Sequence, residues 1–454
     1  MNRVFKTKWS AAHQQYVVTD EHHATKGKAA KSTLAIAVAS IMMATGAQAA
    51  YMEPGFVAEN STQVTEAQKS FETSEYQKDW GLTAMHASKA YALGFNGKGV
   101  TVGVMDSGAL LNIHPDLTGD RFSVSSAKGE YGSVGNRYPQ AVDKDKGTVG
   151  NPFNKGEEFD IDGNWKEGVN DSHGTHVTGT VGGNRDGSEF HGVAWGSNII
   201  VGNTGATDDN NYGPFQDYEY FKAAWGDLAE KIAKANGDRG GVINNSWGTN
   251  TRVEDQKDTG HDGYNTGVHL NVNTEAETDY EFMFFAKRYG FDQTAANGIV
   301  DDQSFVYAAY EAVKDRNIVQ IMTTGNRDMK NPYYRALYPL YNPAAEKHWI
   351  AVAGLKQGSK VGSYELVKNF NEAGQGKWWT VAAPGNSIYS STTDDHGNPG
   401  YASWGGTSMA APHVAGAMGV LMSRYDQMNA LQVRDVMFTT ANHKNADGTN
   451  MEGW

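Results

Sequence analysis

The sequence contains no cysteine. Disulfide bonds and thiolate metal sites are therefore excluded, and folding cannot depend on the redox state of the compartment. Any bound metal would need oxygen or imidazole ligands. Beyond residue 50 the sequence also lacks a run of eighteen or more apolar residues, so no membrane-spanning helix is expected.

Basic residues are the less abundant charge. The 39 Lys and Arg residues face 52 Asp and Glu residues, which gives a net charge of −13 and an isoelectric point near 5.5. A general affinity for nucleic acid or anionic membranes is not indicated, and no nucleic-acid partner is expected. Glycine is abundant, with 53 of 454 residues, so a globular chain with many loops is predicted.

The first fifty residues read as an export signal. A basic start precedes an apolar run over 33–45, and Ala47 and Ala49 form an A-x-A pattern that predicts cleavage before Ala50. The preceding stretch, "MNRVFKTKWSAAHQQYVVTDEHHATKG", resembles the extended signal region of autotransporters and related large secreted proteins of Gram-negative bacteria. Residues 1–49 are therefore interpreted as an extended signal peptide of a secreted or cell-surface protein.

From Trp80 onward, apolar runs of strand length alternate with helical patterns. The runs are "KGVTVGVMDSG", "SNIIVGN", "GGVINNSWG", "RNIVQIMTTGN", "HWIAVAGL" and "WWTVAAPG", and helices are predicted over 215–236 and 303–316. This alternation predicts an α/β fold of three layers, in which a parallel sheet carries helices on both faces. We expect a lead-in over 50–80 and one domain over 81–454, interrupted by insertions at 123–170 and 249–300.

The stretch "GGTSMAAPHVAG" predicts a helix that begins close to Ser408, because Pro412 is tolerated only near a helix start. A hydroxyl there lies where free N–H groups and the helix dipole stabilise negative charge. Two readings are open at this point. Ser408 is either a nucleophile or an ordinary N-cap.

Three further residues favour the interpretation of Ser408 as a nucleophile. His173, in "NDSHGTHVTGTVGG", follows Ser172, a predicted N-cap, at the start of a helix. Asp106 and Asn326 stand at the carboxyl ends of predicted parallel strands, which meet at one edge of a sheet. A nucleophilic serine needs a base, a carboxylate that orients the base, and an oxyanion donor, and these residues supply one of each.

His173 also belongs to an H-x-x-H pair with His176. Such spacing can indicate a metal site, but the further ligands and the glutamate of a zinc hydrolase motif are missing. The pair is therefore not interpreted as a metal centre.

The motifs "VMDSG", "SHGTHVTGTV", "NNSWG", "TTGN" and "GTSMAAPHVAG" occur in this order between about Trp80 and Tyr425, and together they resemble the subtilisin family of serine peptidases. The resemblance implies that Asp106 orients, His173 acts as base and then acid, Ser408 attacks, and Asn326 donates to the oxyanion. It also implies that an extended peptide substrate pairs with the strand edge at Ser246, Trp247 and Gly248.

The resemblance implies no cofactor for the chemistry, but it makes calcium a plausible structural ion. The loop "DIDGN" with a following glutamate offers oxygen ligands, although its glycine comes too early for an EF-hand, so a plain polar turn stays open. The candidate calcium residues are Asp160, Asp162, Asn164 and Glu167.

The sequence departs from the family in three respects. A folding pro-domain and a closing segment after Ser408 are not recognised, and no translocating outer-membrane barrel, which the leader implies as a partner, follows. The chain is therefore interpreted as the truncated passenger of an autotransporter serine protease. Two alternatives are a non-enzymatic or catalytically impaired passenger and an esterase that uses Ser408, Asp426 and His443.

Overall fold

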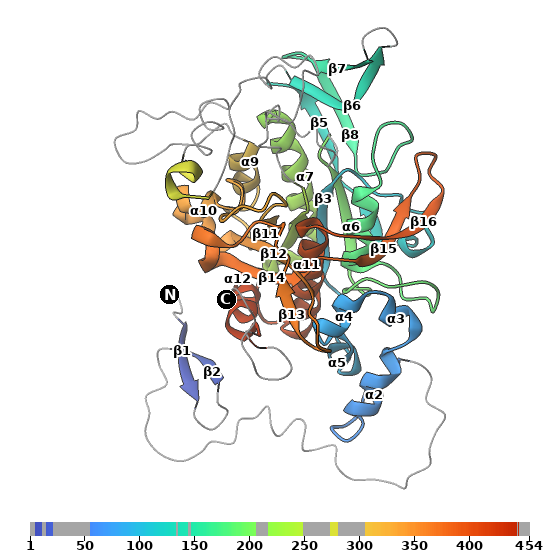
Figure 1. The fold of residues 1–454 in the computed structure, drawn as a ribbon, viewed down its shortest axis with the longest axis vertical. Helices are drawn as coiled ribbons and strands as arrows, with labels where there is room; N and C mark the ends of the chain where they lie inside the picture. Colours follow the sequence, from blue (N-terminus) through green and yellow to red (C-terminus); the bar gives the residue numbers. More distant parts are fainter. Residues whose placement is uncertain are drawn as a thin grey trace.

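The computed structural model describes residues 5–10, 15–20, 55–132, 135–143, 147–205, 217–247, 273–279, 305–442 and 444. At its centre lies an eight-stranded, mostly parallel sheet (Figure 1). From one edge to the other its strands are β13 (Tyr364–Leu366), β12 (Trp349–Gln357), β11 (Ile318–Thr323), β10 (Gly241–Asn245), β3 (Thr101–Asp106), β9 (Asn198–Asn203) and β4 (Phe122–Val124), and β14 (Thr380–Pro384) also pairs with β12.

The six predicted strand runs are all confirmed as members of this sheet. They pair in parallel, for example β10 with both β3 and β11, so their carboxyl ends lie at one edge. The sequence patterns did not predict the short edge strands β4, which is parallel to β9, and β13, which is antiparallel to β12.

Alternate residues of each central strand face opposite sides of the sheet, as the pleat requires. Val242 of β10 belongs to the core shared with α6 (His173–Gly182), α11 (Thr407–Arg424) and α12 (Ala430–Thr440), whereas its neighbour Ile243 belongs to the core shared with α7 (Tyr218–Asn236) and α9 (Phe305–Glu311). Helices therefore cover both faces, and the predicted three-layer α/β fold is confirmed.

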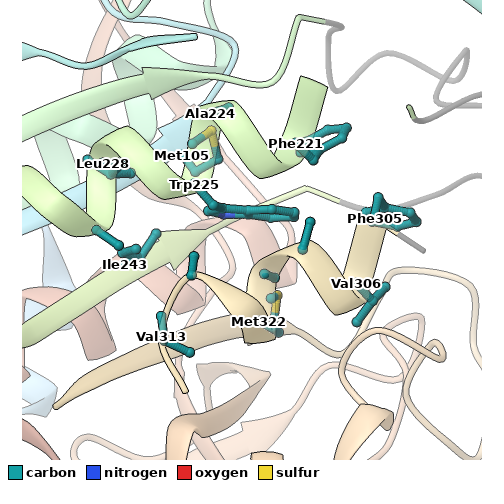
Figure 2. Packing of buried hydrophobic residues seen from close by; sticks show 14 of the residues in the cluster. Met105, Phe221, Ala224, Trp225, Leu228, Ile243, Phe305, Val306, Val313 and Met322 are labelled. Atoms are coloured by element: carbon teal, nitrogen blue, oxygen red, sulfur yellow. The ribbon is translucent and has the colours of Figure 1, made fainter. Parts of the chain in front are cut away.

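The core between the sheet and helices α7 and α9 is rich in aromatic side chains. Figure 2 shows Phe221 and Trp225 of α7 and Phe305 of α9 in one cluster with Met105, Ile243 and Met322 from the strands. The rings of Trp225 and Phe305 are stacked, with centroids 6.5 Å apart. This aromatic packing fastens α7 and α9 to the sheet.

Two helix boundaries differ from the sequence-based prediction. Helix α7 begins at Tyr218 because the side chain of Asp217 accepts a 2.9 Å hydrogen bond from the Tyr220 N–H and caps it; 215 and 216 lie outside the described residues. Helix α9 ends at Glu311, and irregular turns lead from there to β11. The predicted extension to residue 316 was wrong, although single helical hydrogen bonds such as that from Lys314 N–H to the Tyr310 carbonyl continue into the turns.

Between residues 55 and 100, four short helices precede β3, the first strand of the central sheet, and they are blue in Figure 1: α2 (Val64–Phe71), α3 (Ser74–Lys78), α4 (Trp80–Ala84) and α5 (Ala87–Ala92). Their buried side chains, including Phe71 and Tyr91, form a third core with Val193 and Val420 of the main body. The N-terminal segment therefore packs directly against the layer that contains α11.

The remaining strands form two-stranded sheets apart from the central sheet. Antiparallel pairs are formed by β1 (Phe5–Ser10) with β2 (Gln15–Asp20), β5 (Ser126–Glu130) with β8 (Glu158–Asp162), β6 (Gly135–Asp143) with β7 (Gly147–Phe153), and β15 (Ile388–Thr393) with β16 (Pro399–Trp404). Short helical turns are α10 (Tyr338–Tyr341), η1 (Pro115–Leu117), η2 (Gly237–Arg239), η3 (Pro343–His348) and η4 (Gly374–Trp379). Within the described ranges, no helix combines the length and hydropathy needed to span a bilayer.

Candidate active site

The carboxylate of Asp106 and the imidazole of His173 lie in direct contact at the carboxyl edge of the sheet. Asp106 is the last residue of β3 and His173 the first of α6, and Asp106 Oδ1 lies 2.8 Å from His173 Nδ1. The carboxylate is fully buried, whereas 12% of the His173 side chain is exposed. Because an ionised carboxylate only accepts hydrogen bonds, this contact places a proton on Nδ1 and fixes the ring orientation.

Two residues that the sequence analysis did not identify, Ser107 and Asp171, form hydrogen bonds to this pair. Ser107 donates its N–H to Asp106 Oδ1 at 2.8 Å, its Oγ accepts from the Gly174 N–H at 2.9 Å, and its hydroxyl donates to Asp171 Oδ1 at 3.0 Å. Asp171 Oδ1 in turn accepts from the His173 N–H at 2.8 Å. One network therefore joins the end of β3 to the first turn of α6.

This network corrects the predicted cap of α6. Ser172 is the N-cap position, but its side chain makes no capping hydrogen bond, and the carboxylate of Asp171 caps the helix instead. Burial raises the pKa of Asp171, although its bond to His173 N–H acts in the opposite direction. The pattern D-x-H before a small-residue helix was the available signal, since aspartate commonly accepts from the N–H two residues on.

A glycine allows the two elements to approach so closely. A Cβ atom at Gly174 would collide with the backbone carbonyl of Gly108. The first turn of α6 thus lies directly against the loop that follows Asp106, and only glycine fits there.

Ser408 lies in the first turn of α11, as predicted, and is 94% buried, with 6% of its surface exposed. The N-cap of this helix is Gly406, which has no side chain. The reading of Ser408 as an ordinary N-cap is therefore wrong. Pro412 is accommodated within the helix, which packs against α6.

Asn326 contacts the same helix start from the loop after β11. Its Oδ1 accepts hydrogen bonds from the N–H of Thr407 at 2.8 Å and from the hydroxyl of Thr407 at 2.9 Å. An ideal Cβ built on Gly406 would lie 3.4 Å from Asn326 Nδ2 and 3.6 Å from Ser408 N. Two N–H donors from separate segments therefore border one small space beside Gly406.

His176 occupies a different environment from His173. Its ring stacks on Trp404 of β16, with centroids 4.4 Å apart, and its Nε2 lies 3.1 to 3.2 Å from the carbonyl oxygens of Ala402 and Ile388. Burial lowers the pKa of His176 to about 3, so it is neutral. Because His173 faces Asp106, the two histidines do not converge on a metal.

The predicted substrate-binding residues follow β10. Ser246 is buried and its Oγ accepts a 2.8 Å hydrogen bond from the side-chain amide of Asn244. The indole of Trp247 lies in the aromatic core and donates to the carbonyl of Met105 at 3.0 Å. Its side chain thus belongs to the core, and only its backbone lies along the strand end. Gly248 lies outside the described residues.

The candidate calcium residues do not form a metal site in the structure. Asp160 pairs with Lys128, Asp162 with Lys166, and Glu167 with His396, while the N–H of Asn164 donates to Asp162 Oδ1. In the part of the chain that the structure describes, no group of three or more acidic or histidine side chains is arranged to hold an ion. The carboxylates face separate cations, so the plain polar turn is favoured for this loop.

The esterase alternative fails on geometry. Ser408 lies in the first turn of α11 and Asp426 follows its last residue, Arg424, so at a rise of 1.5 Å per residue about 25 Å of helix separates them. His443 lies outside the described residues.

Comparisons with known proteins identify the family of the chain. Residues 97–454 match the family model "Subtilase family", and residues 1–50 match "Extended Signal Peptide of Type V secretion system". The chain belongs to the subtilase family. The predicted family, extended signal peptide and secreted or cell-surface location in a Gram-negative bacterium are confirmed.

Individual relatives are distant. An extracellular serine protease of Serratia marcescens is 28% identical over 433 residues, covering 89% of this chain and 35% of the relative. The autotransporter lipoprotein NalP of Neisseria meningitidis is 25% identical over 290 residues, which cover 62% of this chain and 24% of NalP. The solved structure of fervidolysin from Fervidobacterium pennivorans superimposes with a TM-score of 0.48 at 20% identity. The superposition covers 82% of this chain and 43% of fervidolysin. The chain thus spans about a third of the Serratia relative.

Proposed function

We propose that this subtilase is a secreted serine endopeptidase that cleaves peptide bonds through an acyl-enzyme on Ser408. The contact of Asp106 with His173 Nδ1 carries the proposal, because a buried carboxylate that fixes the tautomer of a partly exposed imidazole is the arrangement that a general base requires. A purely structural histidine would be expected in a fully enclosed site, like His176.

In the proposed reaction His173 takes the hydroxyl proton of Ser408 as the oxygen attacks the scissile carbonyl, forming a bond to carbon. Asp106 stabilises the imidazolium that results. The side-chain amide of Asn326 and the backbone N–H of Ser408 donate to the oxyanion in the space beside Gly406. His173 then gives its proton to the leaving amine, and water hydrolyses the ester by the same route.

We propose that an extended peptide binds along the backbone at the end of β10, from Ser246 to Gly248, by strand addition. Such pairing reads backbone groups and needs no cofactor. We further propose that residues 81–454 form the peptidase unit after the lead-in of 50–80, and that a type V translocating domain is the export partner, as the name of the matching signal family suggests.

A fluorophosphonate probe tests the proposal on the purified chain without its leader. Wild-type protein should be labelled and should cleave a peptide substrate, whereas Ser408→Ala should do neither, and His173→Ala should label far more slowly. Failure of the folded wild-type protein to label would instead favour the second candidate, a passenger with a peptidase fold and no activity.

A further inference from the structure

A buried ion pair joins the N-terminal segment to the helix that carries Ser408. Asp79, the N-cap of α4, places its Oδ2 2.9 Å from Nε2 of His413 in α11. Both side chains are almost fully buried, with exposures of 1% and 0%. The two residues are 334 positions apart in the sequence.

Both nitrogens of the His413 ring face acceptors. Nε2 faces the Asp79 carboxylate, and Nδ1 lies 2.8 Å from the carbonyl oxygen of Met409. Each nitrogen must therefore carry a proton, which makes the ring an imidazolium balanced by Asp79. Burial alone lowers the pKa of His413, but the charge of Asp79 and these hydrogen bonds more than offset it, and the pKa is raised.

The fit around this pair is tight. Asp79 Oδ1 accepts a 2.8 Å hydrogen bond from the Gly81 N–H, and a Cβ atom at Gly81 would collide with His413 Nε2. Trp80 between them donates its indole N–H to the carbonyl of Asn386 at 2.9 Å. The residue before Asn386, Gly385, accepts from the N–H of Gly406 at 2.8 Å. Residues 79–81 therefore contact both α11 and the loop that holds its N-cap.

The start of α11 depends on such lateral contacts. Its N-cap residue, Gly406, has no side chain to cap it, and Pro412 lacks the N–H that would bond the carbonyl of Ser408 within the helix. The first turn consequently has fewer internal hydrogen bonds than an ordinary helix. The first two turns are instead held by Asn326, through Thr407, and by residues 79–81, through His413.

We propose that the Asp79–His413 ion pair positions Ser408 for attack, so that the active site is complete only when residues 79–81 are docked on α11. This rests on the proposed peptidase function. Asp79 and His413 are positioning residues, because neither is expected to touch the substrate. The predicted lead-in would then serve as a fixed part of the catalytic framework.

The test compares Asp79→Asn, His413→Gln and the double variant with wild type. Active sites are counted by fluorophosphonate titration, and kcat per site, KM and the labelling rate are measured well below each melting temperature. We expect kcat and labelling to fall at least roughly tenfold with KM within about twofold, because small misplacements of reacting groups reduce the rate of the chemical step. The double variant should lose no more activity than the worse single variant, since both remove one contact.

Tyr91→Phe is the matched control. It deletes the hydrogen bond from the Tyr91 hydroxyl to the Val193 carbonyl, which fastens the same N-terminal segment in the third core and not at His413. It should lower the melting temperature and leave kcat per site unchanged. If Asp79→Asn does not accumulate as folded protein, Asp79→Glu, which keeps the charge but displaces it, is measured in the same way.

A wild-type kcat per site in the folded variants, with only the melting temperature lowered, would overturn the positioning role. An equal loss of kcat in Tyr91→Phe would also overturn it, because general loosening of the segment would then suffice. Failure of the proposed function is distinguishable, since wild type itself would then neither label nor cleave peptide.

Discussion

Asn326 Oδ1 accepts two hydrogen bonds from one residue, the N–H and the hydroxyl of Thr407. This double contact determines which way the amide is turned, because only the oxygen can accept and the nitrogen must therefore face elsewhere. Nδ2 accordingly faces the space beside Gly406, near the N–H of Ser408. The side chain thus has a structural end and a donor end.

The two ends of Asn326 can be separated by substitution. Asn326→Asp keeps an oxygen for Thr407 but removes the donor, and Asn326→Leu removes both. If the donor stabilises the oxyanion, each variant should lose about 10²–10³ in kcat with little change in KM, the size of effect known for such a donor in a subtilisin. Steady-state kinetics on a peptide substrate, normalised to folded protein, measures this.

Thr407→Val provides the control for the structural end. It removes the hydroxyl that donates to Asn326 Oδ1 and accepts from the Gly325 N–H, but it leaves the bond from the Thr407 N–H to Asn326 Oδ1. A small loss of stability with a modest loss of kcat is expected. If Asn326→Asp keeps near-normal kcat, or if activity follows only the folded fraction, Asn326 is not an oxyanion donor.

Gly406→Ala should lower turnover without unfolding the protein. The residue has φ 169° and ψ 159°, an extended conformation that alanine adopts, so the backbone is not strained. The new methyl group, however, would lie 3.4 Å from Asn326 Nδ2 and 3.6 Å from Ser408 N, in the space proposed for the oxyanion. We predict a loss of kcat of at least about tenfold with a melting temperature close to that of wild type.

Gly226→Ala is the matched control for Gly406→Ala, because it also replaces a glycine by alanine. Gly226 lies within α7, and a Cβ there would have no atom within 4 Å. It should raise the free energy of unfolding by about 0.5–1 kcal/mol, because alanine favours a helix interior, and leave kcat unchanged. Normal turnover in Gly406→Ala would show that the oxyanion lies elsewhere.

Local patterns predicted the parallel sheet and its edge well. Buried strands of β-branched residues such as β3 and β11 are recognisable in isolation, and the polar residues Asp106 and Asn326 mark where they end. The helix start at Ser408 was readable for the same reason, since proline and glycine punctuate the chain locally.

Features that depend on the direction of one side chain were not predictable. Whether Trp247 faces substrate or core depends on the room left by Phe221, Trp225 and Phe305, which come from other segments. The Asp79–His413 pair joins residues that no local pattern relates. Asp171 was overlooked because Ser172, next to it, satisfied the simpler capping rule.

Ser107→Ala tests the network around His173. Removing the hydroxyl leaves the N–H of Gly174 without its 2.9 Å acceptor in a buried site. We expect the free energy of unfolding to fall by about 1–3 kcal/mol. We also expect kcat to fall, because Asp171 and the start of α6 lose their link to β3. Urea denaturation and kinetics measure both, and an unchanged kcat would confine Ser107 to a structural role.

Acid should destabilise the protein partly through His191. This ring is fully buried beside Tyr76, Tyr91 and Trp195, and its Nδ1 lies 2.8 Å from the carbonyl of Gly192. Burial lowers the pKa of His191 to about 4. In the unfolded chain its pKa is about 6.5, so between pH 6.5 and 4 the unfolded state binds more protons. The stability that neutral His191 contributes to the folded state is fully present above pH 6.5 and is lost as the pH falls to 4.

His191→Phe isolates this contribution, measured in a Ser408→Ala background so that self-digestion cannot occur. The variant lacks the hydrogen bond to Gly192, so it should be less stable than its parent at pH 8 by about 1–3 kcal/mol. The stability difference should narrow below pH 6.5, at a rate approaching about 1.4 kcal/mol per pH unit, because only the parent takes up a proton at residue 191 on unfolding. Other buried histidines, such as His176, contribute equally to both proteins. Asp116, whose pKa burial raises to about 7, acts in the opposite direction but is present in both proteins, so its effect cancels. A stability difference that stays constant from pH 8 to 4 would show that His191 titrates normally in the folded state.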